Sequence, residues 1–202
     1  MEKVELLQKY IDYVSKQGER PSTVSKLTFA IGIKESDFYT HFSSLKQIEQ
    51  FYWTQTHQTV VNTITQQEVY ANYSVREKLL SYAFTLIEFL KQNRSFVQIV
   101  LKKNCDALKA YKQDLKAYVE PLITEGTQKG EIEDRMFLTQ HYSNVIIQSL
   151  IAILYFWIKD ESTNFEKTDV YVEKSINFIM DILHKNWIDT GLDFLKYQFK
   201  RA

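Results

Sequence analysis

The stretch that decides the fold is residues 18–44, which read GERPSTVSKLTFAIGIKESDFYTHFSS. It contains two short segments with the apolar spacing of helices, 23–31 and 34–42, on either side of Gly32. Glycine adopts a positive φ at little cost, so Gly32 suits a tight turn between two helices. Four apolar side chains can fill a small core around that turn: Val24, Leu27, Ile33 and Phe38. This pattern predicts a helix-turn-helix.

The segments on both sides of this stretch also have a helical period. Before it, apolar residues spaced three and four apart form one helix face, namely Val4, Leu7, Ile11 and Val14. After it, Ser74 and Glu77 form a capping box that begins another helix. Further helices are expected over 45–70, 95–103, 106–128, 134–159, 168–185 and 187–200, with Gly126 and Gly130 marking the end of one of them. The sequence therefore predicts an all-α protein of about ten helices, with an N-terminal three-helix head and a C-terminal helical bundle.

The composition argues against several other classes of protein. The chain has 202 residues, and its 45% hydrophobic and 25% charged residues are typical of a globular protein. Only 5 Gly and 2 Pro are present, which argues against an all-β fold with its frequent turns. Glycine-rich phosphate loops are missing. A lone cysteine, Cys105, argues against a disulfide framework or a thiolate metal cluster.

No catalytic pattern stands out in the sequence. The histidines lie far apart and form no metal-binding motif: His41, His57, His141 and His184. Neither paired carboxylates nor a nucleophile–base pair is visible. We therefore expect no enzyme, no metal and no cofactor.

Charge and hydropathy place the protein in a neutral, non-membrane class. Lys and Arg total 25 and Asp and Glu total 25, so the net charge gives no argument for nucleic acid. The first residues alternate charged and apolar side chains, unlike a signal peptide. The most apolar stretch, Val145 to Ile158, is too short to span a membrane. A cytoplasmic protein is expected.

The helix-turn-helix stretch resembles, without gaps, the DNA-binding signature of TetR-family transcriptional regulators. The matching positions are Gly18, Ser22-Thr23-Val24, Leu27-Thr28, Gly32-Ile33, Phe38-Tyr39, His41-Phe42 and Ser44. The length and the all-α remainder extend the resemblance loosely to the whole chain. It implies a DNA-binding head over residues 1–45 and a ligand-binding and dimerisation domain over 46–202.

The resemblance also implies how the protein would act. Residues 34–42 would enter the major groove of operator DNA, and a homodimer would span two half-sites roughly 34–36 Å apart. A small hydrophobic ligand would release the regulator. Thr23 would bond a phosphate, Ser36 would permit close approach, and Tyr39 would lie against the backbone or base edges. The full set assigned to DNA is Thr23, Lys34, Ser36, Tyr39, Thr40, His41 and Lys46.

The head departs from the family pattern in three places. Lys34 stands where the family usually has a capping Ser or Thr, and Lys is a poor N-cap. Asp37 would place a carboxylate toward the phosphates. Leu45 replaces a phosphate-contacting Lys, although Lys46 follows it. Residues 1–50 hold seven basic and seven acidic side chains, so the head has no net charge, whereas phosphate neutralisation supplies most DNA affinity.

Two apolar helices, 134–159 and 168–185, are candidates for the dimer interface. One stripe of the first is Ile146, Leu150, Ile153 and Trp157, and a second is Ile147, Ile151, Leu154 and Ile158. A helix that is apolar all round is buried on every side. The resemblance implies a four-helix interface, with Ile147, Ile151, Leu154, Ile158, Ile176 and Ile179 as candidate residues. The alternative that both faces are buried within one chain stays open.

The ligand is not identified by the sequence. Thirteen Phe and thirteen Tyr could line an aromatic pocket, but aromatic residues at helical spacing are more often core. Cys105 and His141 could line such a pocket, and a structural role is the commoner one for such residues.

The last predicted helix, 187–200, supports an alternative function. It is amphipathic, with Trp187 and Phe199 on its apolar side, so it could cap the bundle or lie on a membrane surface. With a terminal helix that lies on a membrane, the chain would resemble the TetR-like lipid-binding proteins of ubiquinone biosynthesis, which lack DNA binding. A TetR-like carrier of lipids or other hydrophobic ligands is therefore the alternative, although the mixed charges of the polar face favour packing.

Overall fold

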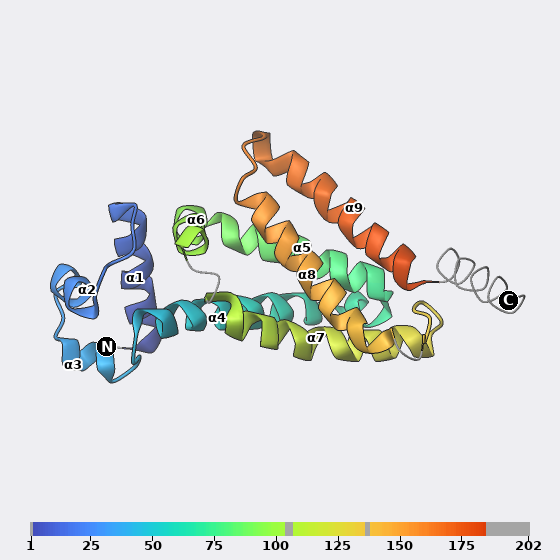
Figure 1. The fold of residues 1–202 in the computed structure, drawn as a ribbon, viewed down its shortest axis with the longest axis horizontal. Coiled ribbons are helices and arrows are strands. Elements are labelled where there is room, and N and C mark those ends of the chain that lie inside the picture. The colour runs from blue at the N-terminus through green and yellow to red at the C-terminus, as the bar shows by residue number, and fades with distance from the viewer. Residues whose placement is uncertain (1, 104–106, 136–137, 185–202) are drawn as a thin grey trace, which may run out of the picture. The chain divides into compact units, whose positions relative to one another are not determined.

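The computed structural model describes residues 2–103, 107–135 and 138–184 (Figure 1). Within these ranges it has nine α-helices: α1 (Lys3–Gln17), α2 (Val24–Ile31), α3 (Glu35–Tyr39), α4 (Leu45–Thr65), α5 (Val75–Lys91), α6 (Arg94–Lys103), α7 (Leu108–Gln128), α8 (Thr139–Trp157) and α9 (Glu166–Leu183). Two 3₁₀ turns, η1 (Glu68–Asn72) and η3 (Thr163–Phe165), lie between them. These ranges contain no strand, so the prediction of an all-α fold is confirmed.

The chain packs as two compact units. The first comprises Met1–Ile64 and Thr85–Leu115, and the second comprises Thr65–Phe84 and Lys116–Ala202. Helices α1, α2 and α3 form the head of the first unit. None of the helices in the described ranges is long and apolar enough to cross a membrane.

The head and the rest of the first unit share an aromatic core. The side chains of the head that are fully or nearly fully buried are Leu6, Tyr10, Val14, Leu27, Phe38 and Phe42. Phe96 of α6 packs edge-on against Tyr10 of α1 and Tyr52 of α4, with ring centroids 5.8 and 4.8 Å apart. Edge-to-face pairs of this kind stabilise a core beyond the area they bury.

The capping box at the start of α5 is confirmed. The Glu77 carboxylate accepts hydrogen bonds from the Ser74 backbone N–H and hydroxyl, both at 2.7 Å, and the Ser74 hydroxyl oxygen accepts from the Glu77 N–H at 3.3 Å. These bonds lower the pKa of Glu77. Glu131 adds a further cap, because its Oε2 accepts from the Val75 N–H at 2.7 Å. The carboxylates of Glu77 and Glu131 therefore accept hydrogen bonds from backbone N–H groups at the start of α5, which have no partner within the helix.

The helix predicted over 45–70 is shorter than expected. It ends at Thr65, and residues 68–72 form the separate turn η1. Tyr70 anchors this turn in the second unit, since its hydroxyl lies 2.8 Å from that of Tyr118 and its ring centroid lies 5.5 Å from Lys78 Nζ. The helix predicted over 134–159 begins at Thr139, five residues later than expected. Cys105 and the helix predicted over 187–200 lie outside the described residues.

The prediction that Gly126 marks a helix end is wrong. Gly126 lies inside α7, and a Cβ there would come within 2.8 Å of Ile132 Cδ1 and 2.9 Å of Val75 Cγ2. This glycine therefore allows close approach rather than a turn. The chain does turn after α7 at Gly130, whose φ is +73°.

Polar contacts hold both ends of α9 within the second unit. At its start, the Asp160 carboxylate accepts hydrogen bonds from the backbone N–H and hydroxyl groups of Ser162 and Thr168, at 2.6–2.8 Å. At its end, Arg135 donates to the backbone carbonyls of Ile182 and His184 at 3.0 and 3.1 Å. Cations favour the negative end of the helix dipole and can satisfy its last carbonyls.

Candidate nucleic-acid interface

The helix-turn-helix is formed by α2, a turn at Gly32 and α3. Thr23 begins α2 as its N-cap, because its Oγ1 accepts the Lys26 N–H at 3.1 Å. Gly32 ends α2 with a φ of +70°, and the following Ile33 N–H donates to the Thr28 carbonyl at 3.0 Å. Gly32 therefore has the left-handed backbone conformation that was expected for a glycine in this turn.

Helix α3 is short and weakly capped. It covers five residues, and Lys34 at its start makes no side-chain capping bond, in line with the poor capping expected of Lys. Phe38 points inward and is fully buried. At the C-terminal end, the Thr40 hydroxyl donates to the Ser36 carbonyl at 3.0 Å. The core contacts of Phe38, more than local capping, therefore hold this helix in place.

The seven residues predicted to contact DNA all lie on the head or in the first turn of α4. Thr23, Lys34, Ser36, Tyr39 and Thr40 are exposed, whereas His41 and Lys46 are half-buried. Tyr39 is 52% exposed, and its ring packs edge-on against Phe38 with centroids 5.7 Å apart. A hollow of about 410 Å³ runs beside α3 and is lined by Ile33, Asp37, Thr40 and His41. The exposed set gives α3 a polar outer face above an aromatic core.

The charges of this face are mixed. Lys34 is exposed, but so are Glu35 and Asp37 on the same short helix. Lys26 pairs with Glu19 at 3.3 Å. Partners of this kind compete with phosphate for the cations, so the face gains little affinity from net charge.

A buried ion pair supports the segment between α1 and α2, and sequence reasoning missed it. Glu49 of α4 is fully buried and binds Arg20 through both oxygens, at 2.6 and 2.8 Å. The Tyr10 hydroxyl donates to Glu49 Oε1 at 2.6 Å, and burial and this carboxylate raise the pKa of Tyr10. The sequence signal was an acidic residue within the apolar stripe of α4, next to Ile48. This pair fixes the loop that leads into the helix-turn-helix.

The rest of the chain identifies the family. The sequence model described as "Tetracyclin repressor-like, C-terminal domain" matches residues 78–197, more than half of the chain. The chain belongs to the TetR family of transcription regulators. No curated protein sequence matches the chain.

Solved structures share the TetR-family fold with this chain. A candidate TetR-family transcription regulator from Shewanella sp. PV-4 is 11% identical, with 91% of this chain and 98% of that one covered and a TM-score of 0.63. A protein of unknown function from Rhodococcus sp. RHA1 is 13% identical, with 91% and 95% covered and a TM-score of 0.60. A TetR-family transcription regulator from Marinobacter aquaeolei VT8 is 14% identical, with 91% and 96% covered and a TM-score of 0.55. Identities this low show the fold alone.

The candidate dimer residues of this TetR-family chain lie inside the chain itself. All six are buried: Ile147, Ile151, Leu154, Ile158, Ile176 and Ile179. Helices α8 and α9 pack against each other within the second unit (Figure 1). The large apolar residues that these helices leave exposed are Val145, Val170 and Phe178. Both predicted stripes of α8 therefore pack within one chain, and a different set of side chains faces outward.

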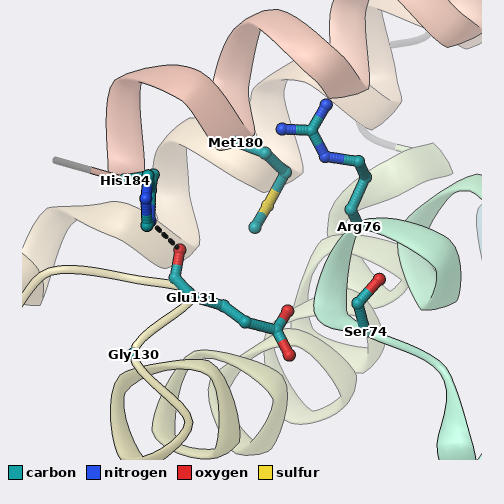
Figure 2. Close-up of a pocket in the computed structure, with 6 residues that line it drawn as sticks. All are labelled: Ser74, Arg76, Gly130, Glu131, Met180 and His184. Carbon is teal, nitrogen blue, oxygen red and sulfur yellow. Dashed lines mark hydrogen bonds between the residues drawn. The ribbon is translucent and has the colours of Figure 1, made fainter. Parts of the chain in front are cut away.

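A hollow of about 390 Å³ lies in the second unit between the start of α5, the 130–131 turn and the end of α9 (Figure 2). Arg76 at its edge donates to Asn177 Oδ1 at 2.7 Å and Asp181 Oδ1 at 2.8 Å. The Glu131 carbonyl lies 3.2 Å from His184 Nδ1, and its carboxylate caps α5. These groups hold α5, the turn and α9 together.

His141 is exposed on α8 and lines none of the hollows described above. Within the described ranges, no cluster of three or more His, Cys, Asp or Glu side chains could hold a metal ion.

Proposed function

We propose that this TetR-family protein binds operator DNA as a homodimer and that a small hydrophobic ligand releases it. In this proposal residues 1–45 bind DNA and residues 46–202 bind the ligand and form the dimer. The observation that carries it is the exposed polar face of α3, with Ser36, Tyr39 and Thr40 held above the buried Phe38, in a chain of this family.

Each exposed group on this face has a role that its chemistry permits. The Thr23 hydroxyl accepts the Lys26 N–H through oxygen, so its proton can be donated to a phosphate at the start of α2. Ser36 is small, which lets the backbone of α3 approach the duplex. The Tyr39 hydroxyl extends from the most exposed ring of α3 toward the DNA backbone.

The dimer is proposed to form through the outward faces of α8 and α9. Phe178 is 61% exposed, and Val145 and Val170 are also exposed. On the same two helices, Phe156 of α8 and Tyr171 of α9 are half-buried and stack with centroids 4.2 Å apart and nearly parallel rings. Such a set of aromatic and aliphatic groups is typical of the centre of an interface. In this proposal the six buried candidates named from the sequence, Ile147, Ile151, Leu154, Ile158, Ile176 and Ile179, stabilise the two helices from inside the chain.

The test is DNA selection followed by mutation. A duplex selected by the protein from a random-sequence pool is titrated with the parent chain and with Tyr39→Ala. Loss of this contact should weaken binding by about 1–3 kcal/mol at fixed salt, without change in the unfolding transition. Val69→Ala, an equally exposed apolar position in η1, is the matched control and should bind like the parent. Equal binding by Tyr39→Ala and the parent would contradict the assigned role of α3.

A second candidate function is a TetR-like carrier that has lost DNA binding. The observation in its favour is the absence of net charge over residues 1–50, together with Asp37 exposed on α3. A carrier would select no duplex from the pool and would instead retain lipid through purification. A membrane surface is a partner only for this candidate, through residues 187–200.

A further inference from the structure

Asp37 is an exposed acidic residue on the side of α3 that also carries Thr40. An α-helix turns by about 100° per residue, so Asp37 lies about 100° around the helix from the buried Phe38 and about 60° from Thr40. Glu35, the other acidic residue of α3, lies about 60° from Phe38 on the opposite side. Asp37 and Thr40 line the hollow of about 410 Å³ beside α3, and Glu35 does not.

This side of α3 presents two neighbouring hydrogen-bond acceptors. The Asp37 carboxylate has no hydrogen-bond or ion-pair partner among the residues that the structure describes. The Thr40 hydroxyl donates its proton to the Ser36 carbonyl at 3.0 Å, so its oxygen is left to accept. Residues three apart are neighbours on a helix surface. A partner for this surface must therefore supply hydrogen-bond donors.

Few groups on a DNA duplex can supply them. Phosphate oxygens are negatively charged acceptors and repel a carboxylate. Base edges in the major groove offer donors only at the amino groups of cytosine and adenine. The adenine amino group lies beside N7, an acceptor that repels a carboxylate oxygen, whereas cytosine has no acceptor next to its amino group on this edge. Cytosine is therefore the base that suits the carboxylate best.

We infer that Asp37 is a specificity-determining residue that accepts a hydrogen bond from the N4 amino group of a cytosine in each operator half-site, an inference that rests on the proposed function. The N-terminal residues of the second helix of a helix-turn-helix contact base edges, and Asp37 is the third residue of α3. On a base without this donor the carboxylate loses water and gains no partner, which penalises the wrong sequence.

The inference gives the neutral head a role in discrimination. Residues 1–50 carry no net charge, so phosphate contacts supply little affinity for DNA of arbitrary sequence. The Asp37 carboxylate lowers that nonspecific affinity further and contributes favourably only where cytosine is present. Specificity depends on the ratio of specific to nonspecific binding, and Asp37 raises this ratio rather than the affinity itself.

The experiment measures base preference at fixed salt. In the duplex that the protein selects from a random-sequence pool, each base pair is exchanged for the three others in one half-site at a time. The parent should lose affinity about tenfold when thymine replaces one particular cytosine, because thymine presents the O4 acceptor where cytosine presents its amino group. Asp37→Asn and Asp37→Thr should reduce this factor to within about twofold. The readout is a ratio for one protein, so the general gain in affinity on removing a negative charge cancels.

A new selection from the pool provides a second readout. Asp37→Asn should select adenine at this position, because an asparagine amide pairs with N6 and N7 of adenine. Glu35→Gln is the matched control, since it removes a carboxylate from the same helix and should retain the preference for cytosine. Both Asp37 variants alter an exposed side chain without a described partner, so they should unfold in urea at the midpoint of the parent.

The outcomes separate this inference from the proposed function. A selected duplex without such a cytosine, or a preference for cytosine that persists in Asp37→Asn and Asp37→Thr, overturns the inference and leaves operator binding intact. An equal loss of preference in Glu35→Gln also overturns it, because the effect would then belong to the charge of the helix rather than to Asp37. A parent that selects no duplex overturns both the inference and the proposed function.

Discussion

The Arg20 guanidinium binds the buried Glu49 carboxylate through two parallel hydrogen bonds, Nε to Oε1 at 2.6 Å and Nη2 to Oε2 at 2.8 Å. Bidentate pairing of this kind fixes orientation as well as distance. Because Arg20 lies in the loop before α2 and Glu49 lies in α4, the pair ties the entry of the helix-turn-helix to the helix that follows it. Tyr10 of α1 completes the site as a third partner.

Removing the carboxylate should destabilise the head strongly. Glu49→Ala leaves Arg20 and the Tyr10 hydroxyl without their acceptor, and breaking one side of a buried pair costs about 3–5 kcal/mol. Urea unfolding followed by circular dichroism measures the change. Glu35→Ala, an exposed carboxylate on α3, is the control and should lie within about 0.5 kcal/mol of the parent. A loss for Glu49→Ala no larger than that of the control would contradict the role of the pair.

Asp160 should make stability depend on pH in the acid range. Burial acts to raise its pKa, but four hydrogen bonds from Ser162 and Thr168 outweigh it and lower the pKa to about 2. A carboxyl whose folded pKa lies below its unfolded value stabilises the fold at pH above the unfolded value. That contribution is lost as pH falls through about 4 toward about 2.

The corresponding measurement compares Asp160→Asn with the parent. Its amide NH₂ would face N–H donors at the start of α9, so the variant should lose about 0.5–2 kcal/mol at neutral pH, like other lost helix caps. The difference between the two proteins should shrink between pH 4 and pH 2. Asp169→Asn, an exposed position in the first turn of α9, provides the control. A pH-independent difference would show that the charge of Asp160 is not the stabilising feature.

The outward and inward faces of the two C-terminal helices should respond differently to charge. Phe178→Asp places a carboxylate on the exposed side of α9, so we expect a folded chain that sediments as a monomer. Ile151→Asp buries the charge inside the chain and should lower the free energy of unfolding by several kcal/mol. Sedimentation velocity at micromolar concentration measures the first effect and urea unfolding the second. A parent that sediments as a monomer contradicts the dimer, and a dimeric Phe178→Asp places the interface elsewhere.

The periodic helices could be predicted from sequence because burial of one face requires a 3.6-residue repeat. The turn at Gly32 and the capping box at Ser74 could be predicted for the same kind of reason, since each has a local chemical cause. Contacts between residues that are distant in sequence could not be predicted in this way. The sequence alone does not show that Glu49 is buried, because its partner Arg20 is distant in the chain. The sequence likewise suggests a helix end at Gly126, whereas the structure shows Ile132 and Val75 packed closely against this glycine.

The exposure of the proposed DNA-contacting residues could be predicted from the sequence. These residues lie in one stretch, so the exposure of side chains such as Tyr39 follows from the helix period. The dimer face is different, because an apolar stripe does not reveal whether its partner is the same chain or a second copy. The burial of Ile151 and the exposure of Phe178 depend on how α8 packs against α9.

Two residues that depart from the TetR-family pattern, Asp37 and Leu45, should limit the neutralisation of DNA phosphates by the head. Asp37→Thr removes an exposed negative charge from α3, and Leu45→Lys adds a cation in the first turn of α4, where the half-buried aliphatic stem can keep its packing. The double variant should bind more tightly at low salt and steepen the slope of log affinity against log salt by about one unit, because one more counterion is released. Asp37→Thr with Leu45→Gln, which adds no cation, separates the two effects and should leave the slope unchanged. Unmeasurable binding by all three proteins at every salt concentration would remove operator binding as the function and favour the carrier.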